Sequence, residues 1–429
     1  MFKLRPFVIA LVAVLVVLAV APAAAQETTV LTVWDVWTRD VEDAMGEELA
    51  AEFEAAHPGV DVQRTAYLFD DLMTTLPLAL SDEGGPDVAA VNQGRTSMGA
   101  LVEAGLILPL NEYADEYGWW NRYAPVLHAR NSFTEDGSVY GEGNMYGMSN
   151  TAEVVGAYYW KQAFADMGLE IPTTFAEFET LLQTIKDAGH TPLAFGSLDG
   201  WPAIHEYSAI QHPLSTVQAI DDFIFRREGA TFVDDANLLA AQKLVEWVDA
   251  GYFPDGFEGM DYDNATLQTF LNQDAVMWIT GSWMTSVLVE QAGEEGIGFF
   301  VIPPADPEDP PLAIGGVGIP FGISARSANP DLAAEYIDFI TGPDTAARLL
   351  EVGFLPAAPV DPSALTEGTL TADTVNAWNL ISSKNAVGHY LDWAVPLDDL
   401  NASLQELLAK QITPEEFVAQ VQEAYEGAA

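Results

Sequence analysis

Cysteine is absent from the 429-residue sequence. No disulfide can form, so the stability of the fold has to come from packing. Cysteine is excluded as a nucleophile and as a metal ligand. A lipid anchor attached through cysteine is excluded as well. If the chain is exported, we therefore expect it to be periplasmic or extracellular and not lipid-anchored.

Basic side chains are scarce. Lys and Arg number 16 against 64 Asp and Glu, which gives a formal net charge of −48. Such a chain repels nucleic acid and anionic lipid, so neither is expected as a partner. Two interpretations remain: a surface that binds cations, and a solvated acidic coat suited to high salt. The acids are dispersed along the chain, which favours the coat.

Long apolar runs are also few, and the longest lies at the start of the chain. Phe7 to Val20 is apolar throughout, Lys3 and Arg5 precede it, and small residues follow at Ala23 to Ala25. This pattern predicts a signal peptide over residues 1–25, with Gln26 as the mature start. The alternative is a membrane anchor, but the run is shorter than the roughly 20 residues that span a bilayer.

Familiar catalytic and metal-binding motifs are missing. The six histidines contain no H-x-x-x-H pair, and no P-loop, G-x-G-x-x-G or G-x-S-x-G occurs. Asp261 to Asp263 resembles the start of a calcium loop, but the required glycine and glutamate do not follow. We therefore expect no metal, no cofactor and no enzymatic activity. A carboxylate pair for glycoside cleavage stays open, because acids occur everywhere.

The chain that remains alternates strand and helix signals. Its length favours two lobes, and its hydrophobic content of 49% supplies a large core. Apolar runs predict strands at 30–34, 60–62, 87–91 and 275–280. Apolar periodicity and caps, including the boxes Thr174–Glu177 and Thr413–Glu416, predict helices near 41–53, 96–104, 174–189, 234–248, 329–340 and after 413. This alternation is typical of an α/β fold.

Six segments follow one another along the chain: LTVWDVWT (31–38), GGPDVAAVNQGRTSMGALVEAGLILPL (84–110), YGMSNTAEVVGAYYWKQAFADMGLEIPTTFAEF (146–178), FLNQDAVMWITGSW (270–283), GGVGIPFGIS (315–324) with the helices of 333–356, and HYLDWAVPLDDLNASLQELLAKQITPEEF (389–417). In this order they resemble the extracellular solute-binding proteins of ABC importers, in the carbohydrate-binding, maltodextrin-binding-protein-like branch. The resemblance covers nearly the whole chain after the signal peptide.

The resemblance implies a type II-like periplasmic-binding-protein fold, in which two α/β lobes close by hinge motion over a ligand in the cleft between them. We expect the first lobe to comprise residues 27–150 plus 319–352, and the second 151–303 plus 357–429. The proline-rich stretch Pro303 to Pro311 is expected to be one crossing between lobes, and Gly353 to Ala357 another. The expected partners are a small sugar and the membrane permease of an ABC importer, and the protein is expected to be a monomer.

Aromatic side chains at strand ends and turns are candidates for stacking on sugar rings. Trp283 is the foremost, because it follows a buried strand and a Gly-Ser pair, and the resemblance gives this position a stacking role. Trp201 lies in a turn, and Trp37 ends the first strand. Each could instead be a core aromatic.

Four polar residues are candidates for binding sugar hydroxyls. Glu153 has the spacing of a ligand-binding glutamate in the resembling maltodextrin binders. Arg95, Asn92 and Asp392 are the others, and Arg95 could simply pair with one of many acids. In addition, Gly316 and Gly318 could let the backbone approach the ligand, or serve a hinge turn.

Alternative functions remain open at this point. A polyamine or other cation could occupy a similar cleft through carboxylates and cation–π contacts. Three or more unpaired carboxylates in the cleft would favour that alternative. A secreted glycoside-cleaving enzyme and a sensory receptor are further alternatives.

Overall fold

The computed structural model describes residues 28–361, 363 and 365–428. The predicted signal peptide at 1–25 lies outside these residues. Within the described part of the chain, every helix is too short or too polar to cross a membrane.

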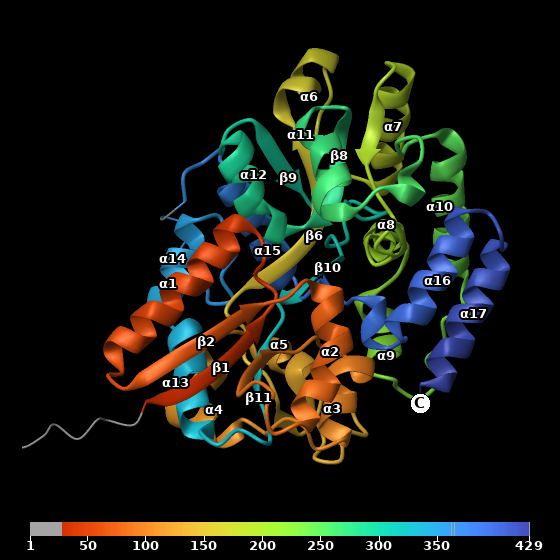
Figure 1. Ribbon diagram of the computed structural model, residues 1–429. Coiled ribbons are helices and arrows are strands. Elements are labelled where there is room, and N and C mark those ends of the chain that lie inside the picture. Colours follow the sequence, from red (N-terminus) through yellow and green to blue (C-terminus); the bar gives the residue numbers. More distant parts are fainter. Residues whose placement is uncertain (1–27, 362, 364, 429) are drawn as a thin grey trace, which may run out of the picture.

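Two main sheets organise the molecule, one in the lower and one in the upper half of Figure 1. The first has the order β11-β3-β1-β2. In it β1 runs parallel to β2 and β3, whereas β11 is antiparallel to β3. Its strands are β1 (Thr29–Asp35), β2 (Val60–Ala66), β3 (Val88–Ala90) and β11 (Phe321–Ile323).

The second sheet has the order β12-β10-β6-β8-β7, with β9 also paired to β6. The long central strand β6 is antiparallel to β8, β9 and β10. Its strands are β6 (Ala152–Trp160), β7 (Thr191–Ala194), β8 (Ala275–Gly281), β9 (Ile297–Phe300), β10 (Ala313–Val317) and β12 (Val387–Gly388). A small hairpin is formed by β4 (Ser132–Phe133) and β5 (Asn144–Met145).

Helices surround both sheets, which confirms the α/β class (Figure 1). Around the first sheet lie α1 (Asp40–Ala56), α2 (Phe69–Ser81), α3 (Ala100–Glu103), α4 (Asn111–Tyr117), α5 (Pro125–His128), α13 (Pro330–Ile340) and α14 (Pro343–Glu351). Around the second lie α6 (Lys161–Met167), α7 (Phe175–Asp187), α8 (Pro202–Gln211), α9 (Val217–Ile224), α10 (Asp235–Ala250), α11 (Leu267–Leu271), α12 (Thr285–Ala292), α15 (Leu370–Ser383), α16 (Leu397–Leu408) and α17 (Pro414–Gly427).

Local sequence signals account for several helix ends. The predicted capping boxes are present: Thr174 accepts from the backbone of Glu177 at the start of α7, and Thr413 accepts from that of Glu416 at the start of α17. Asp234 caps α10 in the same way. Each side chain satisfies a backbone N–H that has no partner inside its helix, so the helix starts at a fixed residue.

The chain passes between the sheets within residues 146–151, at 318–320 and after α14. At the crossing the three segments are hydrogen-bonded side by side: Gly318 N donates to Thr151 O over 2.7 Å, and Ala152 N donates to Leu355 O over 2.8 Å. The predicted crossing at Gly353 to Ala357 therefore lies among them.

The predicted crossing at Pro303 to Pro311 is wrong. This stretch joins β9 to β10, and both strands pair with β6 of the second sheet. Proline excludes regular structure from a segment, but it carries no information about which sheet the flanking strands join.

Candidate ligand-binding cleft

A cavity of about 380 Å³ lies between the two sheets and is lined by residues from both halves of the molecule. Its lining begins where β1, β3 and β8 end, at Asp35, Asn92 and Ser282. In α/β sheets, ligands bind beyond the carboxyl ends of the strands, because the loops that follow them are free to carry polar and aromatic groups.

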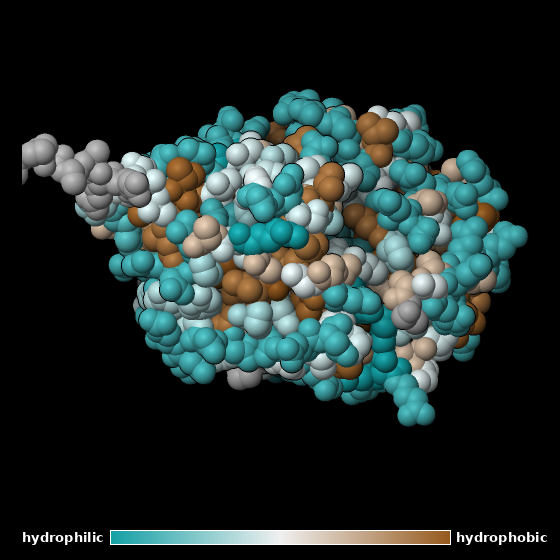
Figure 2. All heavy atoms as spheres, turned by 60° about the horizontal axis from the view of Figure 1, so that its bottom comes forward, coloured by the Kyte–Doolittle hydropathy of each residue, from teal (hydrophilic) through white to brown (hydrophobic). Residues whose placement is uncertain are grey.

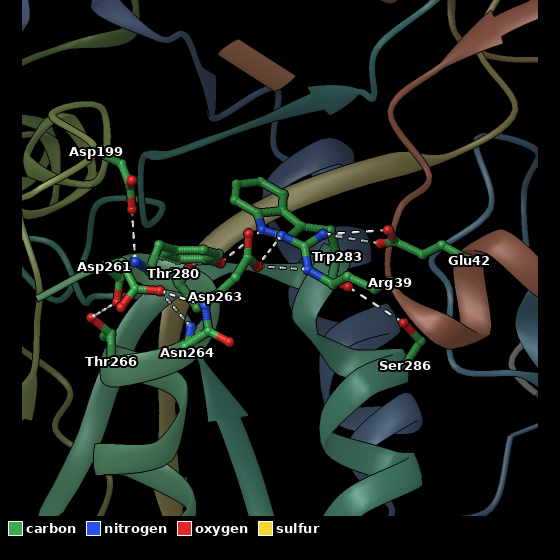
Figure 3. Close-up of polar contacts among 11 residues, drawn as sticks. Arg39, Glu42, Asp199, Asp261, Asp263, Asn264, Thr266, Thr280, Trp283 and Ser286 are labelled. Carbon is green, nitrogen blue, oxygen red and sulfur yellow. Dashed lines mark hydrogen bonds and ion pairs between the residues drawn. The ribbon is translucent and has the colours of Figure 1, made fainter. Parts of the chain in front are cut away.

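Trp283 lies on the wall contributed by the second sheet. Its indole N–H donates to the Tyr262 hydroxyl over 2.8 Å, and that hydroxyl also lies 2.7 Å from Thr280 Oγ1 (Figure 3). A Cβ at Gly281 would collide with the Trp283 ring, so glycine lets this ring fold back over the end of β8. The ring orientation is therefore fixed by the strand end.

Trp201 extends this aromatic wall. Its ring centroid lies 4.5 Å from that of Tyr262 and 6.4 Å from that of Trp283. His205 packs 5.4 Å from Trp283. Two of the three predicted stacking residues thus belong to one cluster that lines the cavity.

Trp37 stands on a second aromatic wall. It stacks on Phe354 with ring centroids 5.7 Å apart and an interplanar angle of 15°. The loop carrying Trp37 is held by Arg64, which donates to the Trp37 carbonyl and pairs with Asp35 over 2.6 Å. Tyr390 and Trp393 add two further rings to the lining, 5.5 Å apart.

Glu153, Asp392 and Asn92 are three of the polar residues in the lining. Asn92 Nδ2 donates to Asp392 Oδ2 over 3.2 Å, across a sequence separation of 300 residues. Burial raises the pKa of Glu153 to about 8, although the charge of Arg130 and the neighbouring Tyr390 hydroxyl lower it. Burial likewise raises the pKa of Asp392 to about 6, against the effect of Asn92.

Arg39 joins the two halves of the molecule at the edge of the cleft. This residue precedes α1, and its guanidinium lies 2.8 Å from Asp263 beside the second sheet and 3.2 Å from the buried Glu42 (Figure 3). The guanidinium is also 5.9 Å from the Tyr262 ring centroid. An ion pair therefore connects the first half to Asp263, the sequence neighbour of Tyr262, which orients Trp283.

Two predicted residues lie outside the cavity lining. Arg95 pairs with Glu103 over 3.4 Å. Pairing with an acid was the alternative to ligand binding that the sequence left open for this residue. Gly316 has φ of 146°, and a Cβ there would collide with the guanidinium of Arg130. Gly318, by contrast, lines the cavity.

Arg130 explains the need for glycine at position 316. Its buried guanidinium donates to the carbonyl of Gly315 and, over 3.2 Å each, to those of Val387 and Gly388. It also lies 5.5 Å from the Trp393 ring centroid. Nothing local in the sequence marks this residue, because all its partners are 185 or more positions away.

The cleft holds carboxylates that the sequence did not single out. Asp70 and Asp199 are two of them. Partial withdrawal from water, followed by the charges of Asp199, Asp71 and Asp398, raises the pKa of Asp70 to about 6. Among the described residues, no basic side chain forms an ion pair with Asp70, Asp199, Glu153 or Asp392.

Other residues of the lining could have been found from sequence. Tyr390 and Trp393 flank Asp392 in the segment HYLDW. Since Asp392 was already a candidate, these neighbouring aromatic residues could have been predicted to line the site as well. Arg39 gave no such signal. Over the described part of the chain, no group of three or more acids or histidines is arranged to hold a metal ion.

Comparison with known proteins gives consistent results. A curated relative, the multiple sugar-binding protein of Streptococcus mutans, is 25% identical over 325 residues, which are 74% of this chain and 72% of the relative. The putative ABC transporter periplasmic-binding protein YcjN of Escherichia coli is 21% identical over 75% of this chain and 71% of its own.

Solved structures share the whole fold. A protein from Caldanaerobius polysaccharolyticus, described in connection with xylan utilization, superposes with a TM-score of 0.80 at 25% identity, over 92% of this chain and 99% of that one. A chitin oligosaccharide binding protein also superposes with a TM-score of 0.80, at 23% identity, over 94% and 99% of the two chains. The fold is therefore the two-lobed one that the sequence predicted.

The family model described as bacterial extracellular solute-binding protein matches residues 39–347. That range runs from the arginine at the edge of the cleft, through both sheets, into α14. This chain therefore belongs to the bacterial extracellular solute-binding protein family.

Proposed function

We propose that the protein captures a sugar or an oligosaccharide in the cleft and delivers it to the membrane permease of an ABC importer. The observation that carries the proposal is that two aromatic pairs line one cavity, Trp283 with Trp201 and Trp37 with Phe354. Flat aromatic rings stack on the apolar faces of sugar rings. Carboxylates and amides form hydrogen bonds with the hydroxyls around the edge of the sugar ring.

The relatives support the same assignment. One is named a multiple sugar-binding protein, and another a putative ABC transporter periplasmic-binding protein. We propose that Trp283, Trp201, Trp37, Glu153, Asn92, Asp392 and Gly318 contact the sugar. We do not include Arg95 and Gly316, because they lie outside the cavity lining.

We further propose that the protein is exported, not lipid-anchored and monomeric, and that it binds its ligand without chemical turnover. The lobes would be those expected from sequence, with β10 added to the second lobe because it pairs with β6. Closure would occur about the three hydrogen-bonded crossing segments.

A thermal-shift screen against mono- and oligosaccharides tests the proposal. A sugar at one hundred times its Kd should stabilise the folded state by about 2.7 kcal/mol. The best sugar is then incubated with the protein and analysed by mass spectrometry, where it should remain intact. Hydrolysis products, or a screen in which no sugar of any length raises the melting temperature, would contradict the proposal.

A cation-binding transport protein is the second candidate. It is favoured by the four cleft carboxylates that have no ion-pair partner in the described chain, since three or more were expected to indicate it. Spermidine and putrescine therefore belong in the same screen. Stabilisation by these amines and by no sugar would assign this second function.

A further inference from the structure

Several hydrogen-bond donors of the cleft are used internally. All three nitrogens of the Arg39 guanidinium bond to Asp263 and Glu42. The Gln93 amide donates to the carbonyls of Val317 and Gly318. The Trp283 indole donates to Tyr262, and the Asn264 amide donates to Asp261. A ligand that relied on these groups for donors would find them occupied.

Carboxylate acceptors also line the cavity. Asp70 and Asp199 are two of them, and one oxygen of Asp199 accepts from the backbone N–H of Tyr262 over 2.7 Å. Glu153 and Asp392 are two more, and Asp392 is only 7% exposed although it lines the cavity. Asn92 donates to one oxygen of Asp392. An ionised carboxylate accepts hydrogen bonds and donates none, so these side chains offer a ligand acceptors and negative charge.

The charge in the cleft is correspondingly unbalanced. Arg39 stands against both Glu42 and Asp263, and Arg130 is the nearby cation for Glu153. Burial of a carboxylate without its own cation is unfavourable, and this cost is visible in the raised pKa values of Glu153 and Asp392. A positive group placed between them would offset it.

We propose, as a refinement that rests on the proposed function, that the sugar captured here carries a basic nitrogen. An ammonium group offers three donors, no acceptor and one positive charge, which complements a cleft of free carboxylates. The aromatic walls suit it as well, because ring faces attract cations in addition to the apolar faces of sugar rings. A sugar that carries a carboxylate or a phosphate is excluded by the same charges.

Sets of sugars that differ at one substituent test this inference. Each set contains a hydroxyl form, an amine form and an acetamide form on one ring skeleton, such as cellobiose, the glucosamine dimer and diacetylchitobiose. Galactose-type and monosaccharide sets are included, together with one uronic acid. Calorimetry should show the amine form binding at least tenfold more tightly than its hydroxyl and acetamide partners, and no binding of the uronic acid.

Variants identify the groups responsible. A bound ammonium favours the charged form of both carboxylates, so Glu153→Gln and Asp392→Asn each remove a negative charge from the amine complex with little change in shape. Each should reduce the amine-to-hydroxyl affinity ratio severalfold. Glu170→Gln is the control, because Glu170 is an exposed acid outside the cavity lining and its loss changes the net charge equally. The ratio should be unchanged in that variant.

The outcomes separate this inference from the proposed function. Tighter or equal binding of hydroxyl forms in every set that binds overturns the inference and leaves sugar capture intact. An amine preference that Glu170→Gln reduces as much as Glu153→Gln also overturns it, since the effect would then come from overall charge. Binding of polyamines without binding of any sugar overturns both.

Discussion

Trp283 lies on the cavity wall with its orientation fixed by Gly281 behind it and Tyr262 beside it. A ring fixed in this way loses little freedom when a ligand stacks on it, so truncation removes mainly binding energy. Trp283→Ala should weaken sugar binding by about 2 kcal/mol or more, roughly thirtyfold in Kd. Calorimetry measures this change, and Trp283→Phe should retain part of the affinity.

Trp120→Ala is the matched control. Trp120 is also half-buried and hydrogen-bonded, to Asp115, but it lies outside the cavity lining. Its loss should lower the melting temperature without changing Kd. If Trp283→Ala behaves like Trp120→Ala, losing stability and keeping affinity, Trp283 is a packing residue and not a stacking platform.

Glu206 is a buried acid outside the cavity lining. It lies within α8, a helix whose residues are all buried, and over the described residues neither of its oxygens has a hydrogen-bond partner. Burial raises its pKa well above the ordinary value. Since the folded state holds this proton and the unfolded state releases it, stability falls as pH rises above the unfolded pKa.

Glu206→Gln should remove this pH dependence, because the amide resembles the protonated acid. The stability of the variant relative to the natural protein should increase by up to about 1.4 kcal/mol for each pH unit above 4.5 until the folded pKa is reached. Urea unfolding at pH 5, 6, 7 and 8 measures it, with Glu170→Gln as the exposed control. A difference that stays constant across these pH values would show that Glu206 titrates normally.

At the scale of single elements, β10 depends on one glycine. Gly316 combines φ of 146° with the guanidinium of Arg130 in the space where a Cβ would lie. Gly316→Ala should therefore be destabilised twice, by backbone strain of about 1–3 kcal/mol and by displacement of a buried arginine. Thermal unfolding should show a larger loss than in Gly168→Ala, where φ is 66° and no atom lies within 4 Å of the added Cβ. Equal losses in both variants would mean that strain alone accounts for the effect.

The ion pair between Arg39 and Asp263 links the start of α1 to the segment that carries Tyr262. Since it joins the two halves, we expect it to stabilise a closed arrangement and to contribute to affinity only when the lobes are together. Asp263 is 44% exposed, so we expect a modest coupling of about 0.5–1 kcal/mol in a double-mutant cycle of Arg39→Met and Asp263→Asn. Calorimetry of the four proteins with the best sugar measures it.

The control for this cycle is Arg348→Met. Arg348 pairs with Glu48 and Glu52 of α1 over 2.9 and 2.7 Å, and both partners lie beside the first sheet. Its removal should leave Kd unchanged. An absence of coupling between Arg39 and Asp263, or an equal loss of affinity in Arg348→Met, would contradict a role in closure.

The whole molecule carries a net charge of −48, and its basic residues are far too few to neutralise the acids. Figure 2 shows hydrophilic side chains around the edge of the face it presents, with hydrophobic ones gathered nearer its middle. Self-repulsion of this surface should destabilise the protein at low ionic strength, and screening should relieve it. The melting temperature should therefore rise as NaCl is added up to about 1 M, where the Debye length is near 3 Å. A flat or falling melting temperature over that range would contradict an acidic coat adapted to salt.

Several features of this protein followed from sequence alone. The capping boxes at Thr174 and Thr413, the buried strand before Trp283 and the family resemblance each depend on residues close together in the chain. Local hydrogen bonds and apolar periodicity are set by neighbours within a few positions, so they can be predicted without a tertiary structure. The two-lobed α/β fold was predicted from the order in which these features occur along the chain.

The tertiary structure decided which charged side chains belong to the cleft. Among sixteen basic and sixty-four acidic residues, sequence selected Arg95, which pairs with Glu103, and gave no indication of Arg39 or Arg130. It also placed a lobe crossing at Pro303 to Pro311, where two strands of one sheet are joined. The reason is physical: Asn92 meets Asp392 across 300 residues and Arg39 meets Asp263 across 224, so each contact exists only once both sheets have folded and come together.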